Sequence, residues 1–118
     1  MKIAGLAVLA LEDEPIIALA LEDMLADAGA VPIGACSLKE AEQAVEQGGV
    51  DCAILDVNVH HVSSYGLARA LARRGIPFVF ATGYGNSPHP QEFAHIPTIA
   101  KPYTMADIDR AFASLSAE

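Results

Sequence analysis

Positive charge is scarce in this 118-residue sequence. Seven Lys and Arg residues stand against 15 Asp and Glu residues, and the formal net charge at pH 7 is -8. Proteins that bind nucleic acid depend largely on Lys and Arg side chains, which release counterions from the phosphates. The acidic residues are spread along the chain rather than gathered in one tail. The composition therefore argues against a nucleic-acid partner.

Long hydrophobic runs are also absent. No run approaches the roughly 20 apolar residues that a membrane-spanning helix needs. The apolar residues 3–11 follow one lysine, as in a signal peptide, but the acids Glu12, Asp13 and Glu14 come directly after them. We interpret residues 3–11 as a core strand, and we expect a cytoplasmic protein with no membrane partner.

Cysteine is rare. The two residues present, Cys36 and Cys52, show no C-x-x-C pattern and no Cys/His ligand spacing. Both lie in apolar surroundings, so we predict two reduced thiols that are buried in the core. Reduced thiols agree with a cytoplasmic protein.

The length and composition suit one ordinary domain with one core. Hydrophobic residues make up 53% of the chain, and no linker, repeat or low-complexity tract divides it. We expect residues 1–118 to form a single domain, which leaves no room for a separate effector domain.

Short apolar runs alternate with segments of helical periodicity. Strands are expected at residues 3–11, 31–36, 52–56, 76–81 and 96–100. Helices are expected from Pro15 to a stop at Gly29, from the capping box Ser37–Glu40 to Gly48, from a cap at Ser63 or Ser64 to Gly75, and from Thr104 to Leu115. The alternation predicts an α/β fold, an open five-stranded parallel sheet with helices on both faces.

The connection between the fourth and fifth strands is poor in helix formers. Gly83, Gly85, Pro88 and Pro90 disfavour a regular helix there, apart from one turn at residues 91–94. The fourth helix is therefore expected to be short or missing.

Polar side chains follow four of the predicted strands. Residues 12–14 follow the first strand, and Asp56, Thr82 and Lys101 stand at the ends of the third, fourth and fifth. The carboxyl ends of parallel strands meet at one edge of a sheet, so these residues should lie together. Crowded carboxylates repel one another unless a cation neutralises them, and carboxylate and water oxygens are the ligands that Mg²⁺ accepts. The pattern predicts a magnesium site.

Phosphoryl chemistry fits this set of residues. Asp56 stands alone at the end of the central strand and is the best nucleophile candidate, whereas Glu12 and Asp13 are better placed to hold the metal. Lys101 could pair with one phosphoryl oxygen, and the Thr82 hydroxyl could bind another. Each residue alone is more often a cap or a solvated turn residue, so the combination is what indicates function.

Four segments of the chain resemble the signature segments of the receiver domains of two-component response regulators. These segments are Leu9–Pro15, Ile54–Asn58, Phe80–Gly83 and Lys101–Pro102, and the resemblance covers essentially the whole chain. More narrowly, the sequence FATGYG at residues 80–85 resembles the motif of a subgroup of single-domain receivers found mainly in alphaproteobacteria.

The resemblance implies a flavodoxin-like (βα)5 receiver fold and a place in bacterial two-component signalling. It implies that a sensor histidine kinase transfers a phosphoryl group to Asp56. It also implies that Mg²⁺ is held by Glu12, Asp13, Asp56 and the backbone carbonyl of Asn58.

The resemblance further implies how the signal leaves the site. Thr82 and Lys101 would contact the phosphoryl group. Receivers ordinarily report phosphorylation through a face that includes the fourth helix, which is expected to be short or missing here. Our hypothesis is that the segment 83–95 becomes ordered instead and changes the affinity for another protein; the alternative is an inert loop. That partner could be a downstream target or a phosphotransfer protein. The peptide bond between Lys101 and Pro102 is expected to be cis, which X-Pro bonds adopt at modest cost.

The sequence departs from the family pattern in and around this switch segment. Thr98 stands where receivers usually carry an aromatic residue, so Tyr84 or Tyr103 could take over its part, although each is as readily explained by packing. Gly83 has no side chain to shield a phosphoryl group. His89 and His95 are expected to have no role.

The loop after the predicted nucleophile, residues 57–66, is longer than usual and lacks the usual proline. We expect His60 and His61 in this loop to be solvent-exposed. The alternative is that they modulate hydrolysis of the acyl phosphate or bind a transition metal.

Other functions are less well supported by the residues. A Mg²⁺-dependent phosphohydrolase would need a general acid two residues after its nucleophile, where Asn58 supplies an amide. Nucleotide binding of the flavodoxin type would need a less acidic first loop. We therefore expect no enzyme with a separate substrate, and the main alternative is a receiver-like scaffold that binds proteins without phosphorylation. A stand-alone regulator, a phosphate sink, a relay intermediate and a fragment of a larger protein all remain open.

Overall fold

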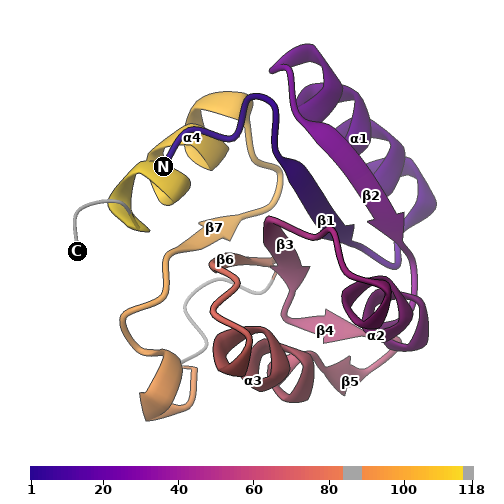
Figure 1. Ribbon diagram of the computed structural model, residues 1–118, viewed down its shortest axis with the longest axis vertical. Coiled ribbons are helices and arrows are strands. Elements are labelled where there is room, and N and C mark those ends of the chain that lie inside the picture. The colour runs from indigo at the N-terminus through magenta and orange to yellow at the C-terminus, as the bar shows by residue number, and fades with distance from the viewer. Residues whose placement is uncertain (84–88, 116–118) are drawn as a thin grey trace.

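A central sheet of five parallel strands organises the molecule, as expected for the α/β receiver fold (Figure 1). The computed structural model describes residues 1–83 and 89–115. From edge to edge the strands are β2 (Val31–Ala35), β1 (Ala7–Leu11), β3 (Cys52–Asp56), β6 (Phe78–Thr82) and β7 (Thr98–Ala100). All four neighbouring pairs are parallel, so the carboxyl ends of the strands share one edge.

Helices cover both faces of this sheet. On one face lie α1 (Pro15–Asp27) and α4 (Met105–Leu115), and on the other lie α2 (Leu38–Gln47) and α3 (Tyr65–Arg73) (Figure 1). Successive strand residues point to opposite faces, so Leu55 packs in the core under α2 and α3, whereas Ile54 packs under α1 and α4. Burial on both faces explains why the central strands are continuous apolar runs.

Local signals fix the ends of α2 as predicted. The Ser37 hydroxyl accepts a hydrogen bond from the Glu40 N–H at 3.1 Å, which satisfies one of the open N–H groups at the helix start. The Glu40 carboxylate accepts in return from the N–H of Cys36 at 3.2 Å, one residue earlier than in the usual capping box. The helix ends at Gly48, whose φ of 83° suits glycine.

The other helices also follow their predicted positions. At α4, Thr104 and Asp107 bond to each other's N–H groups, and the helix buries Ile108 and Phe112. The third helix begins after Ser64, but the Ser64 hydroxyl makes no capping bond. The expected cap position, Ser63 or Ser64, is therefore confirmed at Ser64, but the capping bond from its side chain is not formed.

Two sequence expectations near the strands are corrected. The first strand begins at Ala7 rather than Ile3, because Gly5 with a φ of 80° makes a turn in which the Leu6 N–H donates to the Ile3 carbonyl. Cys52 is buried as predicted, and burial raises the pKa of its thiol to about 12. Cys36 is exposed rather than buried, because it lies just beyond the end of β2.

A small hairpin that the sequence pattern did not predict follows the central strand. It consists of β4 (Asn58–Val59) and β5 (Val62–Ser63), which are antiparallel. His60 and His61 form the two-residue turn between them, with φ of 50° and 65°. Both histidines are exposed, as expected. Turns of this kind usually contain Asn-Gly or Asp-Gly, and two histidines do not indicate a hairpin.

Between β6 and β7, the described residues 89–97 contain one turn of 3₁₀ helix, η1 (Gln91–Phe93), as the sequence predicts for residues 91–94. Tyr84, Gly85 and Pro88 lie outside the described residues. The buried ring of Phe93 packs against the rings of Tyr65, Phe78 and Phe80. One aromatic side chain therefore covers this part of the sheet where a receiver ordinarily places its fourth helix.

His89 connects this segment to two neighbouring elements. Its Nδ1 lies 2.8 Å from the hydroxyl of Tyr65 on α3, and its Nε2 lies 2.6 Å from the hydroxyl of Thr98 on β7. The ring centre is 4.6 Å from that of Phe80, and burial lowers the pKa of the imidazole. The expectation that His89 has no role is therefore wrong as far as structure is concerned. The hydroxyl of Thr98, at the position where an aromatic is usual, is a partner in this bridge.

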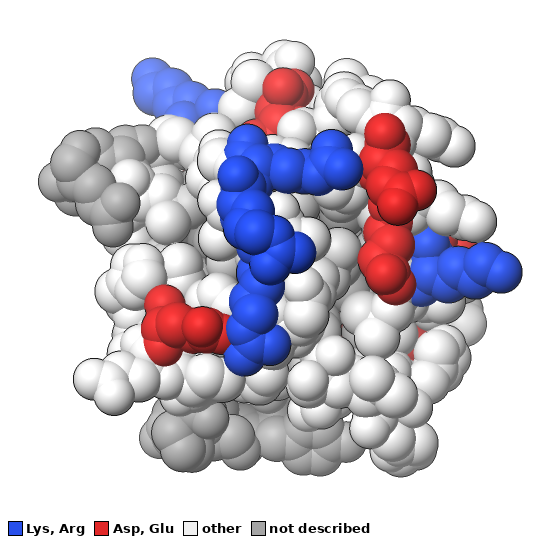
Figure 2. Space-filling model, turned by 60° about the horizontal axis from the view of Figure 1, so that its bottom comes forward, with Lys and Arg blue, Asp and Glu red and all other residues white. Residues whose placement is uncertain are grey.

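Basic side chains gather over α3 (Figure 2). Arg69, Arg73 and Arg74 are all exposed. Arg69 forms an ion pair with Glu92 in η1, and its guanidinium lies 5.7 Å from the centre of the Phe93 ring. Arg74 donates to the Val45 carbonyl of α2 at 3.3 Å. Two of the three arginines thus connect α3 to neighbouring segments of the same chain.

Replacing His89 by Ala should lower the free energy of unfolding by about 1–3 kcal/mol, because the change removes two hydrogen bonds and a ring contact. Urea denaturation measures this difference. The exposed His95 is the matched control, and His95→Ala should stay within about 0.5 kcal/mol of the wild type. Equal effects of the two substitutions would show that the bridge contributes nothing to stability.

Candidate functional site

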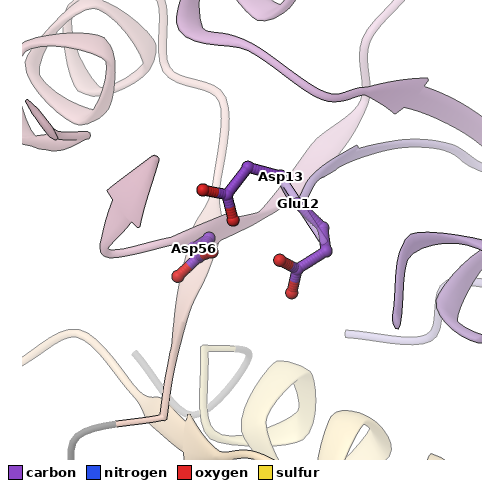
Figure 3. A group of neighbouring side chains, drawn as sticks. All are labelled: Glu12, Asp13 and Asp56. Atoms are coloured by element: carbon purple, nitrogen blue, oxygen red, sulfur yellow. The ribbon is translucent and has the colours of Figure 1, made fainter. Parts of the chain in front are cut away.

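Three carboxylates meet at the carboxyl edge of the sheet. Glu12 and Asp13 directly follow β1, and Asp56 ends the neighbouring strand β3. Each of the three offers an oxygen atom that lies within 4.8 Å of the oxygens of the other two (Figure 3). Glu12 is 1% exposed and Asp56 is 6% exposed, so two of these carboxylates are largely removed from water.

Lys101 completes this group from the end of β7. Its Nζ lies 2.5 Å from Oε1 of Glu12 and 3.0 Å from Oδ2 of Asp56. The Lys101–Pro102 peptide bond is cis, as the resemblance implies. Burial alone lowers the pKa of Lys101, but its bonds to the two carboxylates outweigh burial, so the pKa lies above its ordinary value.

The two aspartates have opposite electrostatic environments. Burial raises the pKa of Asp56, the ion pair with Lys101 opposes part of this rise, and the charge of Glu12 adds to it. For Asp13, burial is outweighed by hydrogen bonds, the largest of them from the N–H of His60 at 2.8 Å, so its pKa is lowered. Asp13 therefore stays ionised to lower pH, whereas Asp56 takes up a proton more readily.

Thr82 reaches the same edge at the end of β6. Asp56 pairs with Ala81 in the sheet register, which places Thr82 one residue further toward the edge, and Thr82 is 7% exposed. Its carbonyl accepts a hydrogen bond from the Lys101 N–H at 2.9 Å. The fold thus brings all four predicted strand-end positions together.

A cleft of about 500 Å³ opens this group to solvent. Its lining includes Asp13, Asp56, Asn58, His60, Gly83 and Lys101. Asp56 therefore lines the cleft together with Asp13 and Lys101. Gly83 is exposed, and a side chain at that position would meet no atom of the described residues within 4 Å.

The donor set fits a divalent metal ion. Three carboxylates facing one ammonium group leave two negative charges uncompensated when all are ionised. All donors are oxygens, which suits Mg²⁺ rather than a soft metal. Asn58 lines the same cleft, beside the carboxylates.

Two features of the site were not predicted from the sequence: the contacts of His60 and the burial of Tyr103. The His60 ring lies with its Nε2 3.1 Å from the Cys36 carbonyl, while its backbone N–H bonds Asp13. Tyr103, considered as a replacement for the missing aromatic, is 9% exposed, and burial raises the pKa of its hydroxyl. Tyr84, the other candidate, lies outside the described residues. Neither feature follows from spacing, because both depend on loop geometry.

Known proteins resemble this chain in sequence and fold. The family model described as response regulator receiver domain matches residues 8–113. The solution structure of SdrG from Sphingomonas melonis Fr1 is 42% identical and has a TM-score of 0.85, with 98% of this chain and 99% of that chain covered. The BeF3-activated conformation of SdrG from Pseudomonas melonis Fr1 is 41% identical, with a TM-score of 0.78 and coverage of 95% and 97%.

A more distant structure shows the same fold. The response regulator TrrA from Thermotoga maritima, in complex with Mg²⁺ and BeF, is 20% identical, has a TM-score of 0.80 and covers 93% of this chain and 98% of its own. No curated protein matches the sequence. Within the described residues, no helix is both long and apolar enough to cross a membrane.

Mg²⁺ affinity should rise with pH. As a metal ligand Asp56 would have to lose its proton, and because burial raises its pKa above the ordinary 3.8, protons would compete with Mg²⁺ well above that pH. Between about pH 5 and neutrality, the Kd should fall by up to about tenfold per pH unit, and it should level off above the raised pKa. Titrations followed by amide NMR measure this. In Asp56→Asn, binding should be weaker and the pH dependence flatter; equal slopes would contradict the assignment.

Proposed function

The chain belongs to the response regulator receiver domain family, and we propose that it is a phosphoacceptor switch in which Asp56 takes a phosphoryl group from a sensor histidine kinase. The observation that carries this proposal is the carboxylate of Asp56 at an open cleft, with Glu12 and Asp13 beside it and the Lys101 ammonium 3.0 Å away. The relative SdrG, 41% identical, has a BeF3-activated conformation, which supports a switch of this kind.

Glu12, Asp13, Asp56 and the backbone carbonyl of Asn58 would hold Mg²⁺, which when bound offsets the charge that gathers on the phosphoryl oxygens. The ionised Asp56 carboxylate attacks phosphorus. A bond forms between its oxygen and phosphorus, and the bond from phosphorus to the kinase histidine nitrogen breaks, so the imidazole leaves with the bonding electrons. The product is an acyl phosphate on Asp56, and no separate substrate is turned over.

Lys101 and Thr82 would read out the modification. Once the Asp56 side chain is an acyl phosphate, its carboxyl oxygens no longer carry the negative charge that attracts the Lys101 ammonium. The ammonium can then pair with a phosphoryl oxygen instead. The Thr82 hydroxyl would bind a second phosphoryl oxygen. Because the Lys101 N–H is bonded to the Thr82 carbonyl, a shift of either residue reaches both β6 and β7.

The segment 83–95 is the proposed output surface. The His89 ring packs against Phe80 of β6 and binds Thr98 of β7, so its position depends on the two strands that end in Thr82 and Lys101. We assign the chain to the FATGYG subgroup of single-domain receivers, with residues 1–118 as one domain whose output is contact with another protein or onward phosphotransfer.

The kinase would dock beside the cleft, on the exposed apolar side of α1. Ile16 is 85% exposed and Leu19 is 64% exposed, which is unusual for large apolar side chains on a helix. A groove of about 350 Å³ with a mainly apolar lining runs between α1 and residues 101–103. Ile17 lines both this groove and the acidic cleft. A helix that fills the groove therefore brings its own side chains next to Asp56.

Beryllofluoride with Mg²⁺ mimics an aspartyl phosphate and tests the switch without a kinase. In amide NMR spectra of the wild type, saturable shifts should appear at Thr82, Lys101 and the segment 83–95, because these residues contact the added group or each other. Asp56→Asn should show none of these shifts and should also lose labelling by a kinase. A folded wild-type protein that does not respond would overturn the proposal and favour a protein-binding scaffold.

Leu19→Asp should slow phosphotransfer from a histidine kinase at least about tenfold, because a charge in an apolar contact weakens docking. Phosphorylation by a small donor such as acetyl phosphate should be unchanged, since Leu19 lies outside the cleft lining. The matched control is Val31→Asp: Val31 is 57% exposed and lies at the start of β2, away from the carboxyl edge. Equal loss with the two variants would rule out α1 as the docking surface.

A further inference from the structure

We propose that His60 is a positioning residue for the metal site: its imidazole ties the hairpin turn to the end of β2, so that its backbone N–H fixes the carboxylate of Asp13. The inference rests on the proposed function, because it concerns the same Mg²⁺ site. It assigns a specific task to a residue that the sequence suggests is merely exposed.

The contacts of His60 join three separate parts of the sheet edge. The backbone N–H donates to Oδ2 of Asp13, after β1, at 2.8 Å. The ring Nε2 lies 3.1 Å from the carbonyl oxygen of Cys36, just after β2, and donates to it when it carries the proton. His60 itself follows β3 and β4, so one residue links the ends of three adjacent strands.

The backbone of the turn needs such a support. His60 and His61 have φ of 50° and 65°, a left-handed conformation that is unfavourable for residues with a side chain. An Asn-Gly turn would hold this shape by itself, but two histidines do not. Only the first histidine has a side chain bonded to another part of the described chain, so the ring of His60 is the support that the geometry offers.

The N–H of His60 in turn limits the rotation of Asp13. The bond occupies one carboxylate oxygen and leaves the other for a metal ion. It is also the largest of the interactions that lower the pKa of Asp13, against the effect of burial. Asp13 is 22% exposed in its side chain, so without this bond it has room to turn toward solvent.

His60 lies outside the group of carboxylates that would hold the ion. Its Nδ1 lies 3.9 Å from Asp13 Oδ2, and the groups of potential ligands within the described residues comprise Glu12, Asp13 and Asp56 alone. Outer partners that orient a metal ligand typically change metal affinity 10- to 100-fold when they are removed. The effect of His60 should be of this kind.

The test compares His60→Ala with His61→Ala. The second variant is the matched control, because it also places Ala at a turn position with positive φ. Mg²⁺ titration of each protein, followed by amide NMR, gives the Kd. We expect the Kd of His60→Ala to rise about tenfold or more, and that of His61→Ala to change less than about twofold. In His60→Gln, the side-chain amide can donate to the Cys36 carbonyl, and the Kd should return to within about threefold of the wild type.

A second measurement does not depend on bound metal. In the metal-free protein, the amide proton of residue 60 should exchange with solvent at least about tenfold faster in His60→Ala than in the wild type, while thermal stability stays close to that of His61→Ala. The same Kd for His60→Ala and His61→Ala would overturn the inference, and so would a loss of affinity that Gln does not restore. If the wild type binds Mg²⁺ and beryllofluoride and His60→Ala behaves identically, this inference fails while the proposed function stands. If the wild type binds neither, both fail.

Discussion

The arrangement of acidic side chains at the carboxyl edge of the sheet depends on the ammonium group of Lys101, which compensates their charge. Glu12 and Asp56 are both nearly buried, and two carboxylates so close together would repel each other in a medium that screens poorly. The ammonium lies 2.5 Å from one and 3.0 Å from the other. Removing one partner from a buried ion pair typically costs about 3–5 kcal/mol, because the remaining charges lose their compensation. The ends of β1, β3 and β7 are thus held in register by charge as well as by backbone hydrogen bonds.

The same arrangement gives the site its chemical character. The single charge of Lys101 cannot balance the three carboxylates, and the remaining negative charge favours binding of a divalent cation. The difference between the two aspartates follows from their surroundings: Asp56 is sunk at the end of the central strand, while Asp13 is partly exposed and receives an N–H bond. The different pKa shifts of Asp13 and Asp56 are therefore set by burial and hydrogen bonding rather than by residue type.

Much of this could be read from the sequence. Continuous apolar strands, the Ser37–Glu40 cap and the Gly48 stop are local signals, and parallel topology alone then brings Glu12, Asp56, Thr82 and Lys101 to one edge. What the sequence did not show depends on contacts between loops. The hairpin turn contains no glycine, which is the usual sequence signal for such a turn. The exposure of Cys36 depends on the residue at which β2 ends. The bridge through His89 joins residues that are nine and 24 positions away, which no periodicity can indicate.

The order in which the strands are synthesised determines when the acidic edge of the sheet gains its compensating charge from Lys101. Glu12, Asp13 and Asp56 are synthesised first, and the lysine arrives with β7, the last strand in the chain and an edge strand of the sheet. A nascent chain that ends before β7 holds these three acids without the ammonium group that lies between Glu12 and Asp56 in the folded protein. Domains generally fold from the N-terminal side as the chain is made, but here the compensating charge is among the last parts of the sheet to be synthesised. An incompletely synthesised chain would thus lack the charge that compensates Glu12 and Asp56, even though both acids are already present.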